Sequence, residues 1–157
     1  MKNIFIPFLF LLSVVSCVNP GEVEKAEVAQ TELGKIDPQA FVDEYFQHFN
    51  NHDWEAMAGM HKEKTQLKDP SFGTEMVWRS REEIVAKYTE LSQVFPDLRD
   101  SVVAVYPSGE NHIIVEFVSK GSSPDGFEFF LPICTIMTIE HGLVSKDFTY
   151  YDDFGEE

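Results

Sequence analysis

The sequence has few basic residues for its length. Its 157 residues include 12 Lys and Arg against 27 Asp and Glu, which gives a formal net charge of −15. A protein that binds nucleic acid needs a basic surface to neutralise phosphates, and docking on anionic lipid headgroups needs clustered Lys and Arg. The charge balance therefore argues against both kinds of partner, and we expect the acidic excess to keep the surface soluble.

The N-terminal hydrophobic run is too short to cross a bilayer as a helix. Residues 4–15 form an apolar stretch of 12 residues behind Lys2, whereas a spanning helix needs about 20. This length and the preceding charge are typical of a secretion signal. The run ends in Val14-Val15-Ser16-Cys17, which resembles the lipobox of bacterial lipoproteins.

The lipobox resemblance implies that residues 1–16 are a signal peptide and that Cys17 carries the lipid that anchors the mature protein to a membrane. Ordinary signal cleavage with a free Cys17, and an uncleaved anchor, are the alternatives. Val18 is not the aspartate that retains lipoproteins at the inner membrane of enteric bacteria. The expected location is therefore the cell envelope, with the outer membrane favoured over the inner.

Cysteine is also scarce, since Cys17 and Cys134 are the only two. Lipidation of Cys17 leaves Cys134 without a partner for a disulfide. A lone thiol in an oxidising compartment is tolerated where it is buried, so we expect Cys134 to be buried.

Motifs for cofactors and metals are missing as well. The sequence has no nucleophile motif, no phosphate-binding glycine loop and no dinucleotide fingerprint, so we expect no cofactor. His48 and His52 are four residues apart, with His61 nearby, and two histidines at that spacing can share a ligand face. No motif places a third ligand, so we expect no metal either.

The rest of the chain divides into a tether and one domain. Residues 17–36 are acidic and have no apolar face, which is typical of a solvated tether. The domain is expected over residues 37–157. It starts at Asp37-Pro38, a capping carboxylate followed by proline at the first helical position, and this first helix extends to about residue 51.

Two further helices and four strands are expected. A short helix follows Asp53, and Ser80-Arg81-Glu82-Glu83 is a capping box that opens a helix reaching about residue 94. Residues 65–69 are expected to be extended, because they precede Pro70. Aromatic and β-branched runs separated by turn residues predict strands at 102–106, 112–119, 127–139 and 143–151.

The order of these elements predicts an α+β domain. Four consecutive strands joined by short turns form an antiparallel meander, and the helices pack on one face of the curved sheet. Pro132 lies inside the longest predicted strand, where it indicates a sheet edge or a bulge.

Several motifs, in their order and spacing, resemble the nuclear transport factor 2-like superfamily over residues 37–154. The closest match within it is the SnoaL-like polyketide cyclase branch, with ketosteroid isomerase a more distant relative. The resemblance implies a cone-shaped, curved antiparallel sheet wrapped around N-terminal helices and enclosing an apolar pocket. Because the family commonly dimerises through the outer sheet face, it also implies a homodimer. The motifs are Tyr45 in the first helix, Asn50-Asn51-His52-Asp53-Trp54, Leu67-Lys68-Asp69-Pro70-Ser71-Phe72-Gly73, Phe95-Pro96-Asp97-Leu98-Arg99 and Tyr150-Tyr151-Asp152.

Compared with ketosteroid isomerase, Tyr45 falls at the oxyanion-hole tyrosine and Asp69, 24 residues later, at the general base. A carboxylate in a dry pocket can remove a proton next to a carbonyl while a phenol donates to the enolate oxygen. In that enzyme a protonated aspartic acid is the second hydrogen-bond donor to the enolate oxygen. Cys134 occupies the matching position in this sequence, and a thiol is a weak donor. The alternatives are a core tyrosine at Tyr45 and an ordinary turn at Asp69.

Asp147 is a second carboxylate of interest. SnoaL-like cyclases use an aspartate on the last strand as acid and base for ring closure, and Asp147 is the nearest candidate. The alternative is an exposed residue on the outer face of the sheet. If Asp147 and Asp69 both enter the pocket, mutual repulsion raises one pKa.

Two functions therefore stay open at this point. The first is a cofactor-free isomerase or cyclase acting on a small hydrophobic carbonyl compound, with Asp69 as base, Tyr45 as oxyanion donor and Asp147 as alternative acid and base. The second is a non-catalytic lipoprotein that binds or carries a small apolar ligand. In both, Phe49, Phe117 and Cys134 line the wall of the pocket. An interaction domain that uses the outer sheet face is a third reading.

Overall fold

The computed structural model describes residues 36–152. The signal peptide, Cys17 and almost all of the tether lie outside these residues and stay predictions. The described chain forms helices α2 (Pro38–Asn50), α3 (Trp54–Gly59) and α4 (Arg81–Val94), a short 3-10 helix η1 (Pro70–Phe72), and strands β1 (His61–Lys68), β2 (Val77–Ser80), β3 (Arg99–Ser108), β4 (His112–Ser122), β5 (Glu128–Glu140) and β6 (Leu143–Tyr150). No helix in this described part is long and apolar enough to cross a membrane.

The predicted helix caps are present. The Asp37 carboxylate accepts hydrogen bonds from the amides of Gln39 and Ala40 at 3.0 and 3.3 Å, with proline at the start of α2. At the start of α4, Ser80 and Glu83 each accept from the other's amide, as the capping box requires. These local contacts explain why both helix starts could be located from sequence.

The six strands form one curved, open sheet in the order β2-β1-β6-β5-β4-β3. The four predicted strands pair as the expected antiparallel meander. The first two strands add to it: β1 pairs with β6 in parallel and with β2 antiparallel, so the sheet is mixed. The α+β fold class is confirmed, and the helices precede most of the sheet.

Strand β1 was predicted only at its end, and β2 was missed. Two of the inward positions of β1 are polar, His61 and Thr65, and both are fully buried. A strand with polar residues on its buried face lacks the apolar alternation by which strands are found in a sequence.

Pro132 lies at a local sheet edge, as predicted. Residues 128–132 of β5 pair with β4 on one side. On the other side, pairing with β6 begins only at Cys134 and Tyr150. The ladder therefore needs no hydrogen bond from Pro132 toward β6.

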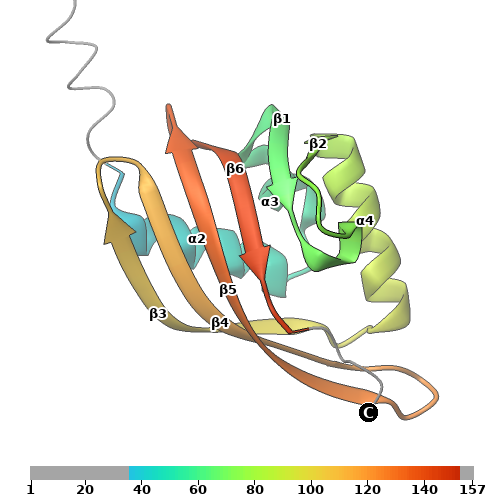
Figure 1. The fold of residues 1–157 in the computed structure, drawn as a ribbon. Helices are drawn as coiled ribbons and strands as arrows, with labels where there is room; N and C mark the ends of the chain where they lie inside the picture. The colour runs from blue at the N-terminus through green and yellow to red at the C-terminus, as the bar shows by residue number, and fades with distance from the viewer. Residues whose placement is uncertain (1–35, 153–157) are drawn as a thin grey trace, which may run out of the picture.

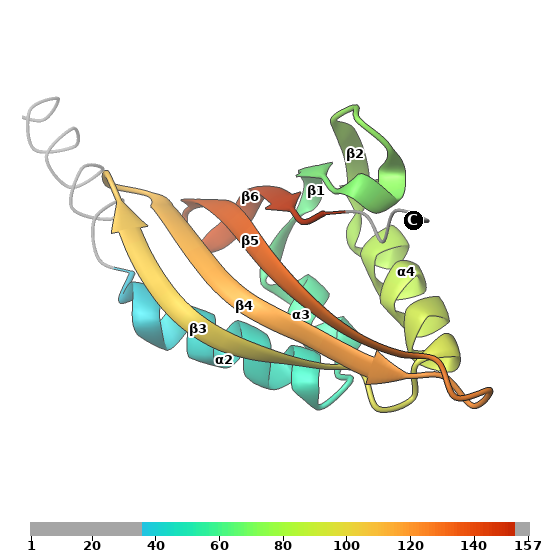
Figure 2. The ribbon, with the colours of Figure 1, turned by 60° about the horizontal axis from the view of Figure 1, so that its bottom comes forward.

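The helices cover one face of the sheet (Figures 1 and 2). Helix α2 packs on β3, while α4 packs against α3, β1 and β2. The long strands β3, β4 and β5 curve past α2 toward the end of the molecule where α4 lies (Figure 2). This leaves the inner face of β4 and β5 partly uncovered by helix packing.

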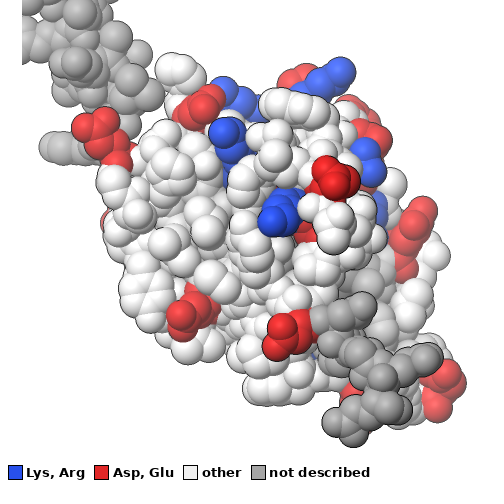
Figure 3. All heavy atoms as spheres, viewed as in Figure 1, with Lys and Arg blue, Asp and Glu red and all other residues white. Residues whose placement is uncertain are grey.

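The outer sheet face carries few charges, as Figure 3 shows. Its exposed side chains include Val103, Tyr106, Phe130 and Tyr150, of which Phe130 is 69% and Val103 66% exposed. Exposed apolar patches of this kind often mark interaction surfaces.

Candidate functional site

A cavity of about 730 Å³ lies between α2, α4 and the inner face of the sheet. Its size is in the range of small-molecule sites, which are usually apolar with a few polar groups. Most of its wall consists of aromatic and aliphatic side chains. The polar residues on it are Tyr45, Asp69, Ser71, Lys87, Tyr88, Glu90, Asp100, Ser119, Thr135, Asp147, Thr149 and Tyr151.

Strand geometry decides which residues reach this cavity. On β5 the inward residues alternate and include Ile133, Thr135 and Met137. On β6 the register with β5 shifts between the pairs Thr138–Lys146 and Ile139–Val144, which leaves Ser145 as an extra residue. The bulge allows Val144 to be buried while Asp147 still points inward.

Asp147 lines the cavity. The sequence had left open whether it faces the pocket or lies exposed on the outer face of the sheet, and it faces the cavity. The Thr135 hydroxyl donates to its Oδ1 and lies 3.1 Å from the Thr149 hydroxyl. Burial raises the pKa of Asp147 to about 6, and the nearby Asp69 carboxylate adds to the rise, although the threonine hydrogen bonds oppose it. A carboxyl group with this pKa can both take up and release a proton near neutral pH.

Asp69 also lines the cavity but is strongly bound. Its carboxylate accepts from the Lys87 ammonium at 2.6 Å, the Tyr151 hydroxyl at 2.9 Å and the Ser71 amide at 2.8 Å. Burial alone would raise the pKa of Asp69, but the charge and hydrogen bond of Lys87 lower it overall. Asp69 is therefore ionised at neutral pH and is a weak base.

Tyr45 lines the cavity beside His61, which the sequence had suggested only as a possible metal ligand. Its hydroxyl lies 3.1 Å from Nε2 of the buried His61. Burial, and then the Arg81 guanidinium, lower the pKa of His61 to about 4, so the ring is neutral. Its Nδ1 is buried and has no hydrogen-bond partner among the described residues.

The neutral His61 ring carries its proton on one nitrogen only. An unpaired buried N–H is rarer than an under-used acceptor, which favours protonation of Nε2. In that tautomer His61 donates to the Tyr45 oxygen and leaves the phenol proton free. Burial, with smaller contributions from Tyr88 and Asp147, raises the pKa of Tyr45 well above its usual value.

Tyr88 and Asp100 are cavity residues that the sequence reasoning missed. Burial raises the pKa of Tyr88 well above its usual value, and Asp147, Asp69 and Asp100 add to the rise, so its phenol lies near all three carboxyls. No described residue hydrogen-bonds the Tyr88 hydroxyl. Tyr88 lies four residues after the buried Ile84, on the same face of α4, and this spacing could have identified it from the sequence.

Asp100 is 7% exposed, and its Oδ1 has no hydrogen-bond partner among the described residues. Burial raises the pKa of Asp100 to about 7, although a hydrogen bond from Ser119 lowers it. The Asn50 side chain holds the backbone here, accepting from the Asp100 amide and donating to its carbonyl, each at 2.8 Å. Asp100 is two residues after the buried Leu98, so strand alternation could have indicated from the sequence that it faces inward.

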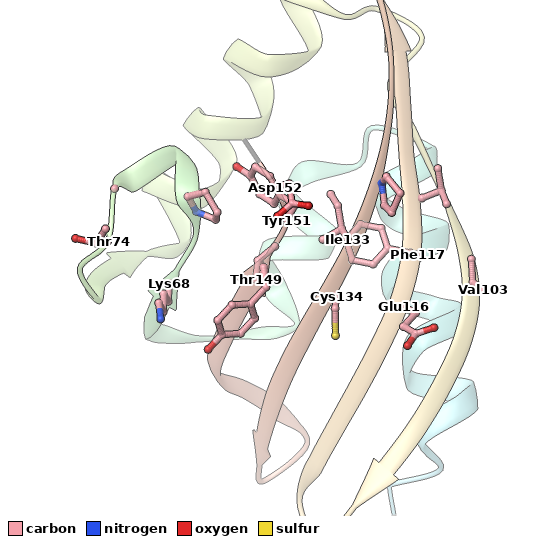
Figure 4. A pocket seen from close by; sticks show the side chains of 15 residues that line it. Lys68, Thr74, Val103, Glu116, Phe117, Ile133, Cys134, Thr149, Tyr151 and Asp152 are labelled. Carbon is pink, nitrogen blue, oxygen red and sulfur yellow. The ribbon is translucent and has the colours of Figure 1, made fainter. Parts of the chain in front are cut away.

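The three residues expected in the pocket wall separate into two groups. Phe49 and Phe117 line the cavity, but Cys134 does not. Cys134 pairs with Glu116 in the sheet, and both line a separate hollow of about 990 Å³ on the outer side (Figure 4). The expectations that Cys134 lines the cavity and is buried are therefore wrong, because strand alternation turns it outward and leaves it half-buried.

The histidines do not converge. His52 bonds the Leu98 carbonyl at 2.9 Å and stacks on Trp54, whereas His61 contacts Tyr45. Across residues 36–152 there is no group of three or more His, Cys, Asp or Glu side chains placed to hold a metal ion.

The fold and cavity define a class of protein, an α+β domain whose helices and curved sheet surround a cavity. Residues 42–147 match the SnoaL-like domain, and the chain belongs to this family. No functionally curated protein matches the sequence.

Solved structures share the fold at low sequence identity. IdmH of Streptomyces antibioticus, proposed to be a polyketide cyclase, has 17% identity and a TM-score of 0.64, covering 74% of this chain and 93% of that one. A protein of Xanthomonas campestris pv. campestris, also proposed to be a polyketide cyclase, has 18% identity and a TM-score of 0.61, covering 73% and 90%.

A third similar structure contains a small ligand. It is a hypothetical protein of Catenulispora acidiphila with a ketosteroid isomerase-like fold, in complex with trimethylamine. The identity is 16% and the TM-score 0.63, over 71% of this chain and 85% of that one. At these identities the structural similarity establishes the shared fold.

Proposed function

We propose that this chain is a cofactor-free enzyme that moves a proton on a small apolar carbonyl compound, as in an isomerisation or a ring closure. The observation that carries the proposal is Asp147, a half-buried carboxyl group on the wall of an aromatic cavity, whose pKa is raised to about 6. The SnoaL-like family and the proposed cyclases among its structural neighbours support the same reaction class.

In the proposed reaction the ionised Asp147 removes a proton from the carbon next to the substrate carbonyl. The electron pair of the C–H bond moves into the carbonyl group and gives an enolate, while Asp147 becomes protonated. A phenol donates a hydrogen bond to the enolate oxygen. The protonated Asp147 then returns the proton to a second carbon, or to the oxygen formed when the enolate attacks another carbonyl.

The roles first assigned to Asp69 and Tyr45 change in this proposal. Lys87, Tyr151 and Ser71 already occupy the Asp69 carboxylate, so we assign the base role to Asp147. Tyr88 is the preferred phenol, because it lies near Asp147 and no described residue bonds its hydroxyl. Tyr45, whose phenol proton is free when His61 donates, is the alternative donor. Asp69 positions Lys87 and Tyr151 at the rim of the cavity.

A carrier without catalysis is the second candidate. The apolar wall and the cavity volume of about 730 Å³ suit it equally well, and the trimethylamine complex of one neighbour is an example of a small molecule bound to this fold. In that case the ligand binds and leaves unchanged.

Hydrogen exchange separates the two candidates. The purified protein is incubated with a panel of enolisable apolar ketones in deuterated water, and deuterium uptake next to the carbonyl is measured by NMR. Enzyme-catalysed uptake that falls by about 10²-fold or more in Asp147→Asn supports catalysis. Asp43→Asn, on the exposed face of α2, is the matched control. Uptake no faster than in buffer, or equal uptake in wild type and Asp147→Asn, contradicts the proposed enzyme.

We also propose that the protein is exported and lipid-anchored at Cys17, in the outer membrane rather than the inner. The sequence of residues 14–17 supports the anchor, and Val18 supports the outer membrane. Metabolic labelling with an alkyne fatty acid in a bacterial host should label wild type and fail to label Cys17→Ala. Labelling of both, or recovery of unlabelled wild type in the soluble fraction, contradicts the anchor.

A homodimer through the outer sheet face is proposed on the exposed Val103 and Phe130. Light scattering after size exclusion should give twice the monomer mass for wild type and the monomer mass for Val103→Glu. A monomeric wild type at tens of micromolar contradicts this proposal.

A further inference from the structure

The charges that line the cavity do not balance. Three aspartates and Glu90 reach its wall, but Lys87 is the only Lys or Arg among its described lining residues. Lys87 forms an ion pair with Asp69 at 2.6 Å. Asp100 and Asp147 therefore lie in the cavity without a cation of their own in residues 36–152.

Asp100 is the less satisfied of these two carboxyls. Asp147 accepts from Thr135, whereas the buried Oδ1 of Asp100 has no partner in the described chain. A buried acceptor without a donor costs about 1–3 kcal/mol, and more when it is charged. Its backbone is held on both sides by Asn50, so the position of Asp100 is fixed.

Asp100 and Asp147 lie apart on the sheet's inner face, on β3 and β6. Asp100 pairs with Ser119, which pairs with Leu131 of β5. Asp147 contacts Thr135, four residues further along β5, which corresponds to about 13 Å of strand. One elongated ligand can therefore meet Asp147 with one end and Asp100 with the other.

The cavity that both carboxyls line has aromatic rings in its wall. Phe49, Phe117 and Tyr88 are among them. The faces of aromatic rings attract cations, and the attraction strengthens where water is excluded. An uncompensated carboxyl beside such rings favours a positive group over a neutral or negative one.

We propose that the ligand of this cavity is an apolar molecule carrying a protonated amine, and that Asp100 binds the amine. An ammonium N–H supplies the donor that Oδ1 of Asp100 lacks, and its charge compensates the carboxylate. The inference deepens the proposed function by naming the substrate class: the carbonyl end lies at Asp147 and the amine end at Asp100.

Amine binding is coupled to ionisation of Asp100. On the helices that pack around the cavity, its titratable residues are Tyr45 on α2 and Lys87, Tyr88 and Glu90 on α4. The pKa of each phenol is raised, and Lys87 is paired with Asp69. Asp100 has no cation of its own, and burial raises its pKa to about 7, so it is about half protonated near pH 7. Binding of an ammonium group then releases a fraction of a proton, and amine affinity increases from pH 5.5 to 8.

The test compares two probes of equal shape by isothermal titration calorimetry on the purified protein. N,N-dimethylbenzylamine is positively charged at pH 7.5, and isobutylbenzene is its neutral carbon analogue. We expect the amine to bind about tenfold or more tightly than the analogue. In Asp100→Asn the preference should fall below about threefold, while affinity for isobutylbenzene stays within threefold of wild type.

Repeating the amine titration in buffers of different ionisation enthalpy gives the protons released. Wild type should release protons at pH 7 and Asp100→Asn should not, with Asp43→Asn behaving as wild type. Equal or weaker binding of the amine by wild type, no amine binding at millimolar concentration, or a preference unchanged in Asp100→Asn overturns the proposal.

This outcome is distinct from that of the exchange experiment, which uses neutral ketones and Asp147→Asn. If the protein prefers the amine but does not catalyse deuterium exchange, the proposed enzyme is contradicted and the protein is a carrier of amines. If it catalyses exchange but does not prefer the amine, the enzyme proposal holds and its substrate is neutral.

Discussion

The ammonium group of Lys87 lies 2.6 Å from the Asp69 carboxylate at the rim of the cavity. This pair keeps Asp69 ionised and leaves Asp147 and Asp100 as the carboxyls whose pKa is raised by burial. The division of three aspartates into one structural anion and two proton-exchanging groups underlies the following predictions.

Breaking the pair should destabilise the domain. Lys87→Met leaves the Asp69 carboxylate largely buried without its cation, and we expect the free energy of unfolding to fall by about 2–3 kcal/mol. The measurement is urea denaturation of wild type, Lys87→Met, Asp69→Asn and the double variant. The double variant should lose less than the sum of the single losses, because the two residues interact. Strict additivity contradicts a stabilising pair.

Asp100 should make stability depend on pH. Its pKa is about 7 in the folded protein and about 3.9 in an unfolded chain. The folded state therefore binds the proton more tightly, and this contribution to stability is present below pH 4 and is lost as the pH rises to 7.

The lowered pKa of His61, about 4, acts in the opposite direction over the same range. His61 is present in both wild type and Asp100→Asn, so its contribution cancels in the difference between their unfolding free energies. This difference should shift in favour of the variant by a few kcal/mol from pH 4 to 7.5. A difference that does not change with pH contradicts the raised pKa.

The two tyrosines should respond differently to loss of the hydroxyl. Tyr88→Phe removes the proposed oxyanion donor, and we expect deuterium exchange of a ketone substrate to slow by about 10²-fold. Tyr45→Phe removes the partner of His61 and should lower stability by about 1–3 kcal/mol with a smaller effect on rate. The reverse ranking of the two rates would restore Tyr45 to the role that the sequence first suggested.

Cys134 should have no part in catalysis. It lies on the outer side of the sheet beside Glu116, and its own partial burial, and then Glu116, raise the pKa of the thiol. Cys134→Ala should leave the exchange rate within about twofold of wild type, since the change does not touch the cavity. A tenfold loss contradicts this placement.

The fold was predictable where local chemistry determines it. The caps at Asp37 and Ser80 and the four apolar runs after residue 98 define the helices and the meander from neighbouring residues alone. Strand β1 was not predictable in the same way, because His61 and Thr65 are buried through partners distant in sequence.

The site was predictable only in part. Tyr45, Asp69 and Asp147 do meet one cavity, but the division of roles depends on Lys87, Thr135 and Tyr151, whose contacts arise from tertiary packing. Asp100 owes its environment to Asn50, 50 residues away in sequence. The bulge in β6 and the alternation of inward and outward residues along β5 decide which side chains face the cavity. No short sequence motif shows either of them.

The pH dependence of deuterium exchange tests the central claim, that Asp147 is the proton-transferring base. For a ketone that the wild-type protein exchanges, kcat/KM should rise with pH and level off, with a midpoint near the Asp147 pKa of about 6. In Asp147→Asn this titration should be lost together with the rate. A wild-type rate that is flat through pH 6, or an unchanged profile in Asp147→Asn, would contradict the account.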